Sequence, residues 1–493
     1  MRRTWSTWFV GFLLIGAGWA LLTPVNQFPD EADHVYRAVS VVRGEVFPHN
    51  GAYTHGTGAI TNVPIGFLRL VYAGPCRGVR TAGLCSTASA PAGSVTVVTA
   101  EGRNFPFYYA AVGWPSLLFP NRAGWYLMRL VSAVWCAALL ATGALVIMSM
   151  SRRPLVLGGA MLVGLTPLVL DLSGSVNPSG LEAASALCFW AVLLALIHKD
   201  SSLDRRLLVQ FGLISGVLLA TCRDLGWFWI VLALVLSLAS AGRADRRSFV
   251  RSRAAHLVFG AAVAAVVAAE VWAFTFHSNQ NFKFTTVPKG LVGAASASLN
   301  STPKLLEETL AYLGWLTIRP PAVADVCWIL AVAAVMVSSF VAGRRAGVLV
   351  VAGAALVVVI PFAILGFTLM HPNDGIWQGR YTLPLAIGVP LLGVAGRRLG
   401  FTEHRFVALL ASIVIFLVLG AQVAVYRSAW ARFGPADHHW YVSLGQASLA
   451  LGALGILANV AWADSRWSLA RRGSTPTRPS PRTLERSGPT RAM

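Results

Sequence analysis

The sequence carries very little charge for its length. Only 12% of its 493 residues are Asp, Glu, Lys or Arg, whereas 56% are hydrophobic. Soluble domains carry roughly a quarter charged residues, and a soluble fold of this size has too small an interior to hide so much apolar surface. The composition therefore argues against a soluble enzyme and predicts a chain embedded in a lipid bilayer.

Lysine and acidic residues are scarce as well. The chain has 20 acidic and 40 basic residues, only four of the basic ones are lysines, and the net charge is +20. The arginines form short clusters between apolar runs instead of one stripe, which argues against nucleic-acid binding and is typical of membrane topology. The arginine bias, with abundant Ala, Val and Gly, favours a bacterial origin and a GC-rich genome.

Cysteine is rare, and motifs of soluble catalysis are absent. The six cysteines contain no Cys-x-x-Cys metal pattern, and four of them lie in or beside apolar runs. Cys76 and Cys85 lie in a polar stretch expected outside the cytoplasm, where they can form a disulfide. The sequence has no Gly-rich Lys loop for phosphate, no His-Glu-x-x-His and no Gly-x-Ser-x-Gly, so ATP hydrolysis by this chain is not expected.

Apolar runs of about 20 residues, the length of a membrane-crossing helix, recur along the chain. No small-x-small cleavage site follows the first run, which we therefore interpret as an uncleaved span. We predict an all-α integral membrane protein with about 12 transmembrane helices in one polytopic domain, residues 1–465. The predicted spans are 5–23, 124–149, 155–173, 179–198, 206–222, 225–241, 254–275, 323–342, 346–369, 381–396, 406–426 and 442–462.

The basic clusters predict the orientation of these spans. Such clusters precede the first span and follow every second one, ending with residues 466–472. Because basic loops face the cytoplasm, we predict that both termini are cytoplasmic in a bacterial plasma membrane. The two longest loops, about 24–123 and 276–322, then face outward. The tail 466–493, rich in Pro, Ser, Thr and Arg, is predicted to be a disordered basic cytoplasmic tail.

For one segment of the first outward loop, residues 105–120, the sequence does not decide how it lies relative to the membrane. Residues 105–120 are apolar, but the segment is short and contains three prolines. It is either a span, a re-entrant piece or an interfacial piece.

An acidic motif follows the first span directly. On a helix, Asp30, Glu31 and His34 share one face, and we take them as candidate catalytic residues. A carboxylate there can deprotonate an acceptor hydroxyl, and Asp30 with His34 can hold a divalent metal, although no cofactor is certain. The alternative is a helix N-terminus whose acidic residues lie at the positive end of the helix dipole.

A second motif, Gln378-Gly379-Arg380-Tyr381, lies at the outer edge of a predicted span. The fork of an arginine matches a phosphate at the level of the lipid headgroups, so Gln378, Arg380 and Tyr381 are candidate substrate-binding residues. The alternative is an interfacial arginine beside an aromatic belt.

Further substrate-binding candidates lie in two outward segments. Asn177 and Glu182 lie around a tight outer turn, where capping of the next helix is the alternative role. Asn104 and Tyr109 belong to an amide- and aromatic-rich stretch that suits sugar faces and hydroxyls, and that equally suits an interfacial aromatic belt.

The order and spacing of the motifs around Asp30, Asn177 and Arg380 resemble a family of uncharacterised bacterial multi-span membrane proteins, a domain of unknown function, over residues 5–462. The architecture of that family is similar to that of the C-type glycosyltransferases, which include protein O-mannosyltransferases and the lipid A aminoarabinose transferase. The wider resemblance implies a polyprenyl-phosphate sugar donor, an acidic catalytic residue after the first span, matched here by Asp30 and Glu31, and a phosphate-binding basic residue, matched by Arg380.

The sequence thus predicts a membrane glycosyltransferase that moves a sugar from a polyprenyl-phosphate donor to a cell-envelope glycan or lipid acceptor on the extracytoplasmic side. Two alternatives remain open. One is a transporter or flippase of an envelope glycan precursor, and the other is a non-catalytic envelope assembly factor. Polar groups gathered at the outer interface and an outward loop of about a hundred residues favour the enzyme over a transporter with a binding site at the bilayer midplane.

Overall fold

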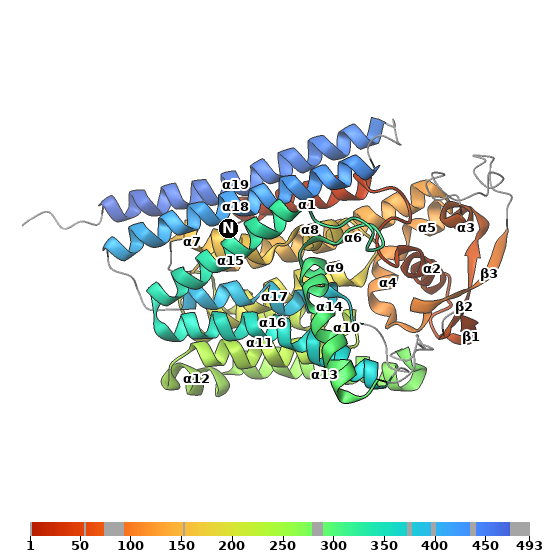
Figure 1. Cartoon of the computed structure of the whole chain (residues 1–493), viewed down its shortest axis with the longest axis horizontal. Helices are drawn as coiled ribbons and strands as arrows, with labels where there is room; N and C mark the ends of the chain where they lie inside the picture. Colours follow the sequence, from red (N-terminus) through yellow and green to blue (C-terminus); the bar gives the residue numbers. More distant parts are fainter. Residues whose placement is uncertain are drawn as a thin grey trace, which may run out of the picture.

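Long apolar helices run side by side along the longest axis of the molecule (Figure 1). The computed structural model describes residues 2–53, 56–72, 93–150, 153–278, 289–371, 377–395, 401–433 and 440–473. By length and composition, nine helices in this described part are able to cross a membrane. They are α1 (Arg2–Leu22), α6 (Arg122–Met148), α9 (Pro178–His198), α10 (Arg205–Cys222), α13 (Arg253–Phe276), α15 (Ala322–Ala342), α16 (Arg344–Met370), α18 (Phe401–Phe433) and α19 (Trp440–Gly473).

Three of the twelve predicted spans differ from a straight membrane helix. The span 155–173 is a broken pair, α7 (Pro154–Gly164) and α8 (Pro167–Ser173), bent by 74°. The break falls where Pro167 begins α8 and the Thr166 side chain caps it. The span 225–241 is the 15-residue α11 (Gly226–Ser240). The span 381–396 consists of short pieces, η3 (Gly379–Thr382), α17 (Leu383–Ala386) and η4 (Val389–Ala395). The predicted class, an all-α integral membrane protein, is confirmed.

The first long loop, predicted over 24–123, is itself a folded unit. Its strands β1 (His49–Tyr53), β2 (Gly56–Pro64) and β3 (Ser94–Thr99) form an antiparallel sheet in the order β1-β2-β3. His49 pairs with Ile60, and Ala59 pairs with Thr99. The helical elements of the unit are α2 (Glu31–Val42), α3 (Ile65–Tyr72), η1 (Ala100–Arg103), α4 (Pro106–Gly113) and α5 (Pro115–Leu118).

The segment 105–120 is too short in both of its helices to cross a membrane. Its prolines begin α4 and α5, and α5 has only four residues. Tyr108 and Tyr109 are buried, whereas Phe107, Trp114 and Leu118 are exposed. A segment that buries one face and exposes large apolar side chains on the other suits the membrane–water interface.

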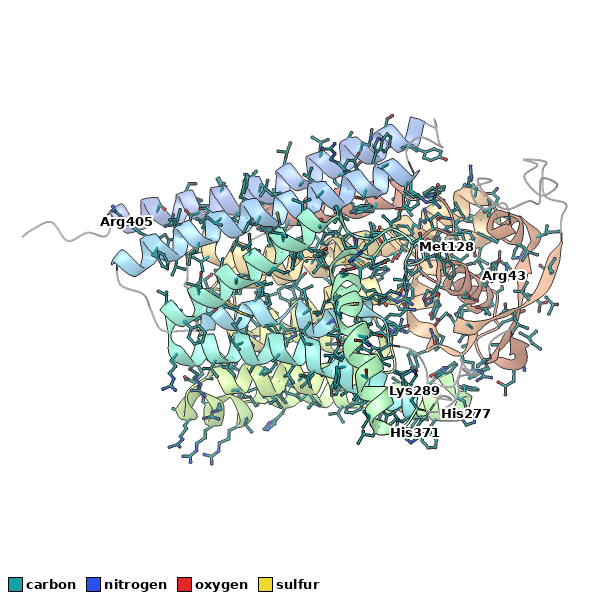
Figure 2. All side chains as sticks on the ribbon, in the orientation of Figure 1. Arg43, Met128, His277, Lys289, His371 and Arg405 are labelled. Carbon is teal, nitrogen blue, oxygen red and sulfur yellow. The ribbon has the colours of Figure 1, made fainter. Side chains whose placement is uncertain are left out.

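The sheet and the basic helix α12 (Arg243–Val250) lie at opposite ends of the long axis (Figure 1). Figure 2 likewise shows Arg405 far along this axis from Arg43, a residue of the loop unit. The sidedness of these two ends stays a prediction, in which the loop unit faces outward and the basic clusters face the cytoplasm. The last helix, α19, continues to Gly473, beyond the predicted domain boundary at residue 465.

Glycines let α1 pack closely against α19. A Cβ atom on Gly452 would lie 2.7 Å from the carbonyl oxygen of Gly11, and one on Gly18 would lie 2.8 Å from that of Gly445. Close backbone approach through small residues is a general way of joining membrane helices. It fixes α1, whose outer end leads into the acidic motif. The remaining long helix, α14 (Leu291–Ala311), lies in the second outward loop and supports the Arg380 motif.

Candidate functional site

A fully buried ion pair fastens the start of the acidic motif. Arg129, in α6, donates from Nε and Nη2 to the two carboxylate oxygens of Glu31, each at 2.6 Å. The same guanidinium also donates to the carbonyl oxygens of Ala20, Thr23 and Pro24, at 2.6–2.9 Å. Neither side chain is exposed. Because Arg129 occupies both oxygens of Glu31, this carboxylate suits a positioning role better than the catalytic role predicted from the sequence.

Asp30, the residue before Glu31, does not cap α2. Its backbone is left-handed, with φ of 55°, and its side chain makes no capping hydrogen bond. Left-handed backbone is uncommon outside glycine and is often found at functional residues. The side chain instead pairs with Arg380 and remains 23% exposed. Burial by itself would raise the pKa of Asp30, but the adjacent Arg380 guanidinium holds it below the usual range.

Arg380 reaches Asp30 from a segment 350 residues away, and a glycine makes this approach possible. Gly379 N–H donates to Glu308 in α14, and the Gly379 carbonyl oxygen accepts from Thr309. A Cβ on Gly379 would lie 2.4 Å from the backbone nitrogen of Thr309 and 2.5 Å from the carbonyl oxygen of Leu305. The close contact therefore requires glycine and fixes η3 against α14.

Two guanidiniums lie next to the Tyr381 ring. The Cζ atom of Arg223 is 4.5 Å from the ring centroid, and that of Arg380 is 5.3 Å from it. Arg223 follows α10 and also donates to the hydroxyl of Ser179, at 3.2 Å. Both arginines interact electrostatically with Asp30. The site thus places two guanidiniums beside the Asp30 carboxylate, with Glu101 and Glu182 within electrostatic range of Arg223. Guanidiniums are well suited to binding the oxygens of a negatively charged ligand.

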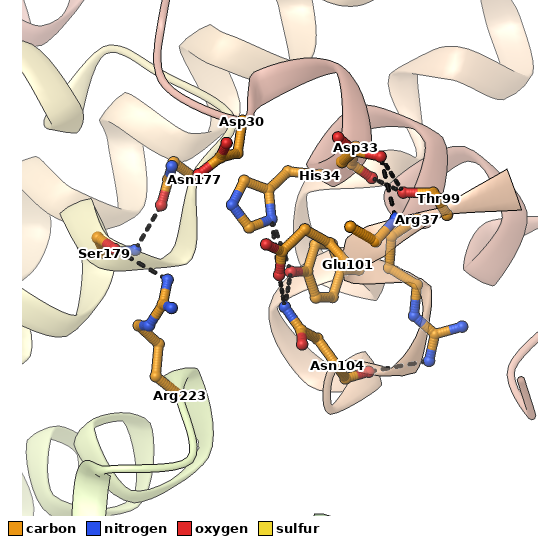
Figure 3. A network of polar contacts seen from close by, with 12 residues as sticks. Asp30, Asp33, His34, Arg37, Thr99, Glu101, Asn104, Asn177, Ser179 and Arg223 are labelled. Carbon is orange, nitrogen blue, oxygen red and sulfur yellow. Dashed lines mark hydrogen bonds and ion pairs between the residues drawn. The ribbon is translucent and has the colours of Figure 1, made fainter. Parts of the chain in front are cut away.

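Asn177 joins the start of α9 to the acidic motif (Figure 3). Its Oδ1 accepts from Ser179 N–H, so it caps α9 as the capping interpretation expects. Its Nδ2 donates to the carbonyl oxygen of Pro29 at 3.0 Å, directly before Asp30. Glu182, one turn further along α9, is buried and lies in the electrostatic range of Arg223.

His34 has the Asp30 side of the site on one flank and Glu101 on the other (Figure 3). Its Nδ1 lies 2.9 Å from the hydroxyl of Tyr109 and 4.0 Å from Glu101. Asn104 donates from Nδ2 to the Tyr109 hydroxyl and to the Glu101 carboxylate. Burial lowers the pKa of His34 to about 4, and Glu101 and Asp30 offset this only in part. The imidazole is therefore neutral near pH 7.

Asp33 ties α2 to the sheet. Its carboxylate accepts from the Thr99 hydroxyl at 2.8 Å and from Ala100 N–H at 3.1 Å. Burial raises its pKa to about 7, assisted by the nearby negative charges of Glu101 and Asp30. This carboxyl faces away from Arg380 toward β3, so we assign it to the support of the site.

Several buried polar atoms around Asp30 have no hydrogen-bond partner in the described part of the chain. They are Nε2 of His34, Nε and Nη1 of Arg380, Oε1 of Gln378 and both carboxylate oxygens of Glu182. Buried polar groups are normally paired, because an unmade bond costs about 1–3 kcal/mol. Unpaired buried atoms on charged side chains of this kind call for a bound partner, such as a ligand.

The residues present offer an incomplete metal site. Within the described ranges, no group of three or more His, Cys, Asp and Glu side chains is placed to hold a metal ion. Asp30 is paired with Arg380, and His34 contacts Tyr109 through Nδ1. The suggested Asp30–His34 metal pair therefore stays a prediction without further ligands near it.

Of the residues predicted from the sequence, the structure brings most together. Asp30, His34, Asn104, Tyr109, Asn177, Arg380 and Tyr381 meet in one network, and Glu182 and Gln378 border it. Cys76 and Cys85 lie outside the described residues. Arg129, Arg223 and Glu101 were not predicted. Arg129 stands alone in a long apolar run, a signal for a functional or paired charge in a membrane, whereas nothing in the local sequence marks Glu101.

An apolar groove of about 490 Å³ lies between α1, α7, α8, α18 and α19. Its lining includes Trp19 near the C-terminal end of α1, Leu170 next to Asp171 in α8, and Tyr426 in α18. Its apolar lining suits a hydrocarbon chain.

The fold and this site define a polytopic α-helical membrane protein with a buried, charged site at the end that carries the loop unit. The chain belongs to the family of predicted membrane proteins known as DUF2142, whose family model matches residues 13–389. No curated protein matches the sequence. Among solved structures, the human organic anion transporter MFSD10 (TETRAN) aligns with 12% identity over 94% of this chain and 99% of that chain, at a TM-score of 0.15.

Proposed function

We propose that this chain is a membrane glycosyltransferase that takes a sugar from a polyprenyl-phosphate donor and transfers it to a cell-envelope acceptor outside the cytoplasm. The observation that carries the proposal is the pairing of Asp30 with Arg380 beside buried donor atoms that lack partners. The site thereby offers both a base and an anion-binding group, and the same molecule has an apolar groove that suits a lipid chain.

In this proposal Arg380 and Arg223 bind the phosphate of the donor. The acceptor hydroxyl attacks the anomeric carbon of the sugar and gives its proton to the Asp30 carboxylate. The bond between that carbon and the phosphate oxygen breaks, and the lipid phosphate leaves with the electron pair. Arg129 and Glu31 fix the loop that presents Asp30.

In this proposal, binding of the donor also changes the pKa of the base, Asp30. In the free protein the Arg380 guanidinium lowers the pKa of Asp30, which makes the carboxylate a weak base. A phosphate that pairs with Arg380 partly neutralises this cation. Burial, which raises the pKa of Asp30, then dominates, so the carboxylate becomes a better proton acceptor when the donor is bound.

The first test is envelope glycan analysis of a deletion strain complemented with wild type, with Asp30→Asn, or with Asp464→Asn. Asp464 is a matched control, because it also pairs with an arginine, Arg153, at 2.9 Å, and is 15% exposed. We expect wild type and Asp464→Asn to restore a missing sugar, and Asp30→Asn to fail at equal membrane abundance.

Restoration by Asp30→Asn would remove Asp30 from the mechanism. Measurements on purified protein in proteoliposomes then distinguish between the two alternatives, a transporter and an assembly factor. Flux of a glycan precursor without any covalent product would identify a transporter instead. A triple variant of Asp30, Glu31 and Arg380 that still restores the sugar would identify an assembly factor.

A further inference from the structure

The hydrogen bonds around Tyr109 determine which nitrogen of His34 carries a proton. The Glu101 carboxylate accepts hydrogen bonds only, so the group of Asn104 that faces it is the amide nitrogen, Nδ2. The same nitrogen donates to the Tyr109 hydroxyl at 2.9 Å. The hydrogen of that hydroxyl therefore needs an acceptor elsewhere, and His34 Nδ1, at 2.9 Å, is the acceptor available to it within the described structure.

A His34 ring that accepts at Nδ1 carries its single proton on Nε2. A neutral imidazole has one donor nitrogen and one acceptor nitrogen. Because burial keeps this ring neutral at physiological pH, the acceptor role of Nδ1 leaves Nε2–H as a donor. His34 is completely buried.

This Nε2–H has no partner in the described part of the molecule, and neither have Nε and Nη1 of Arg380. Arg380 pairs with Asp30 through Nη2, and His34 lies within electrostatic range of both Asp30 and Arg380, so the two side chains that carry these donors belong to the same site. Figure 3 shows the His34 ring facing the region between Asp30 and Asn177 on the side away from Glu101. Three unpaired buried donors on two neighbouring side chains of one site favour a ligand rich in acceptor oxygens.

We propose that Glu101, Asn104 and Tyr109 fix His34 as a neutral Nε2–H donor, which binds a phosphate oxygen of the ligand together with Arg380. This inference rests on the proposed function, since it assigns a role to His34 toward the lipid-phosphate donor. It makes His34 a substrate-binding residue, in place of the catalytic residue or metal ligand that the sequence predicts. Tyr109 and Asn104 act through His34 and are positioning residues.

The tautomer is tested directly by solid-state 15N NMR of histidine-labelled protein in lipid. The His34 signals are those that disappear in His34→Gln. We expect Nε2 to be protonated and Nδ1 unprotonated from pH 6 to 8 in wild type, and we expect Tyr109→Phe, which removes the hydroxyl that donates to Nδ1, to produce a mixture of tautomers. Protonation at Nδ1 in wild type, or a Tyr109→Phe spectrum identical to that of wild type, would overturn the inference.

Ligand binding is tested with farnesyl phosphate, a short polyprenyl phosphate, and with farnesol as the uncharged control. The amide nitrogen of glutamine stands close to the position of Nε2, whereas that of asparagine stands close to Nδ1. We expect His34→Gln to bind farnesyl phosphate within about threefold of wild type, and His34→Asn to bind it at least about tenfold more weakly, as the loss of a buried hydrogen bond to a charged group requires.

Each outcome separates this inference from the proposed function. Equal binding of farnesyl phosphate by wild type and both variants would overturn the role of His34 and leave the transferase proposal intact. Wild-type protein that binds farnesol as tightly as farnesyl phosphate would contradict phosphate recognition, and with it both proposals. Circular dichroism and gel-filtration profiles equal to those of wild type confirm that the variants are folded.

Discussion

The buried pair of Arg129 and Glu31 gives the sharpest test of how this site is built. Replacing Glu31 with alanine leaves the Arg129 guanidinium in the protein interior without its carboxylate, where neither residue is exposed. Removal of one partner of a buried ion pair costs about 3–5 kcal/mol. The same guanidinium donates to the carbonyl oxygens of Ala20, Thr23 and Pro24, at the C-terminal end of α1. A displaced Arg129 would lose these hydrogen bonds, so this end of α1 should become less ordered as well.

The assay is unfolding of purified protein in detergent, followed by the fluorescence of its 17 tryptophans. We expect Glu31→Ala to lower the free energy of unfolding by about 3–5 kcal/mol. A Glu31→Met/Arg129→Met double variant should lose less than Glu31→Ala alone, because no buried charge is left unpaired. The control is Asp464→Ala, which breaks the partly exposed pair with Arg153 and should cost below about 1 kcal/mol.

The reasoning fails if Glu31→Ala unfolds like wild type but has lost all transferase activity. That result would return Glu31 to the catalytic role predicted from the sequence. Loss of stability together with partial activity in the surviving folded protein supports the positioning role.

Three further predictions concern the supports of the site. Gly379→Ala should destabilise the protein by about 1–3 kcal/mol in the same assay, because its Cβ would lie 2.4 Å from a backbone nitrogen of α14. Asp33, whose pKa burial raises to about 7, should contribute stability that is present at low pH and lost as pH rises through 7. Asp33→Asn should therefore flatten the slope of stability between about pH 4 and 7, the interval between the ordinary and the raised pKa of this carboxyl. Asn177→Ala should cost about 1–2 kcal/mol through loss of the α9 cap, and should also weaken transfer, since Asn177 holds the carbonyl of Pro29.

Membrane class and most site residues could be predicted from the sequence because their signals are local. An apolar run of about 20 residues identifies a span wherever its neighbours lie. Asp30 and Arg380 were recognisable because each is a charged residue at the edge of a span in a chain poor in charge. Their partnership was not predictable, since 350 residues separate them and only the packed bundle brings them together.

The features that the sequence did not predict correctly also have physical explanations. The span 381–396 looks like a helix by composition, but Pro384 and Pro390 divide it into short pieces beside η3. The sheet in the loop 24–123 was not predicted, because β1 and β2 contain glycines, which weaken the sequence pattern of a strand. Arg223 falls between two predicted spans, 206–222 and 225–241, and nothing in that position indicates that it lies over the ring of Tyr381.

The difference between satisfied and unsatisfied buried charge separates support from function in this molecule. Arg129 donates to five acceptor atoms, so nothing remains for a ligand. Arg380, equally enclosed, uses Nη2 for Asp30 and Tyr381 while Nε and Nη1 have no partner in the described structure. A protein gains no stability from burying such donors unpaired. The free-energy cost of these unpaired donors is understandable if a ligand accepts their hydrogen bonds. Substrate binding should therefore be measured first in variants of Arg380 and His34, and not in variants of Arg129 and Glu31.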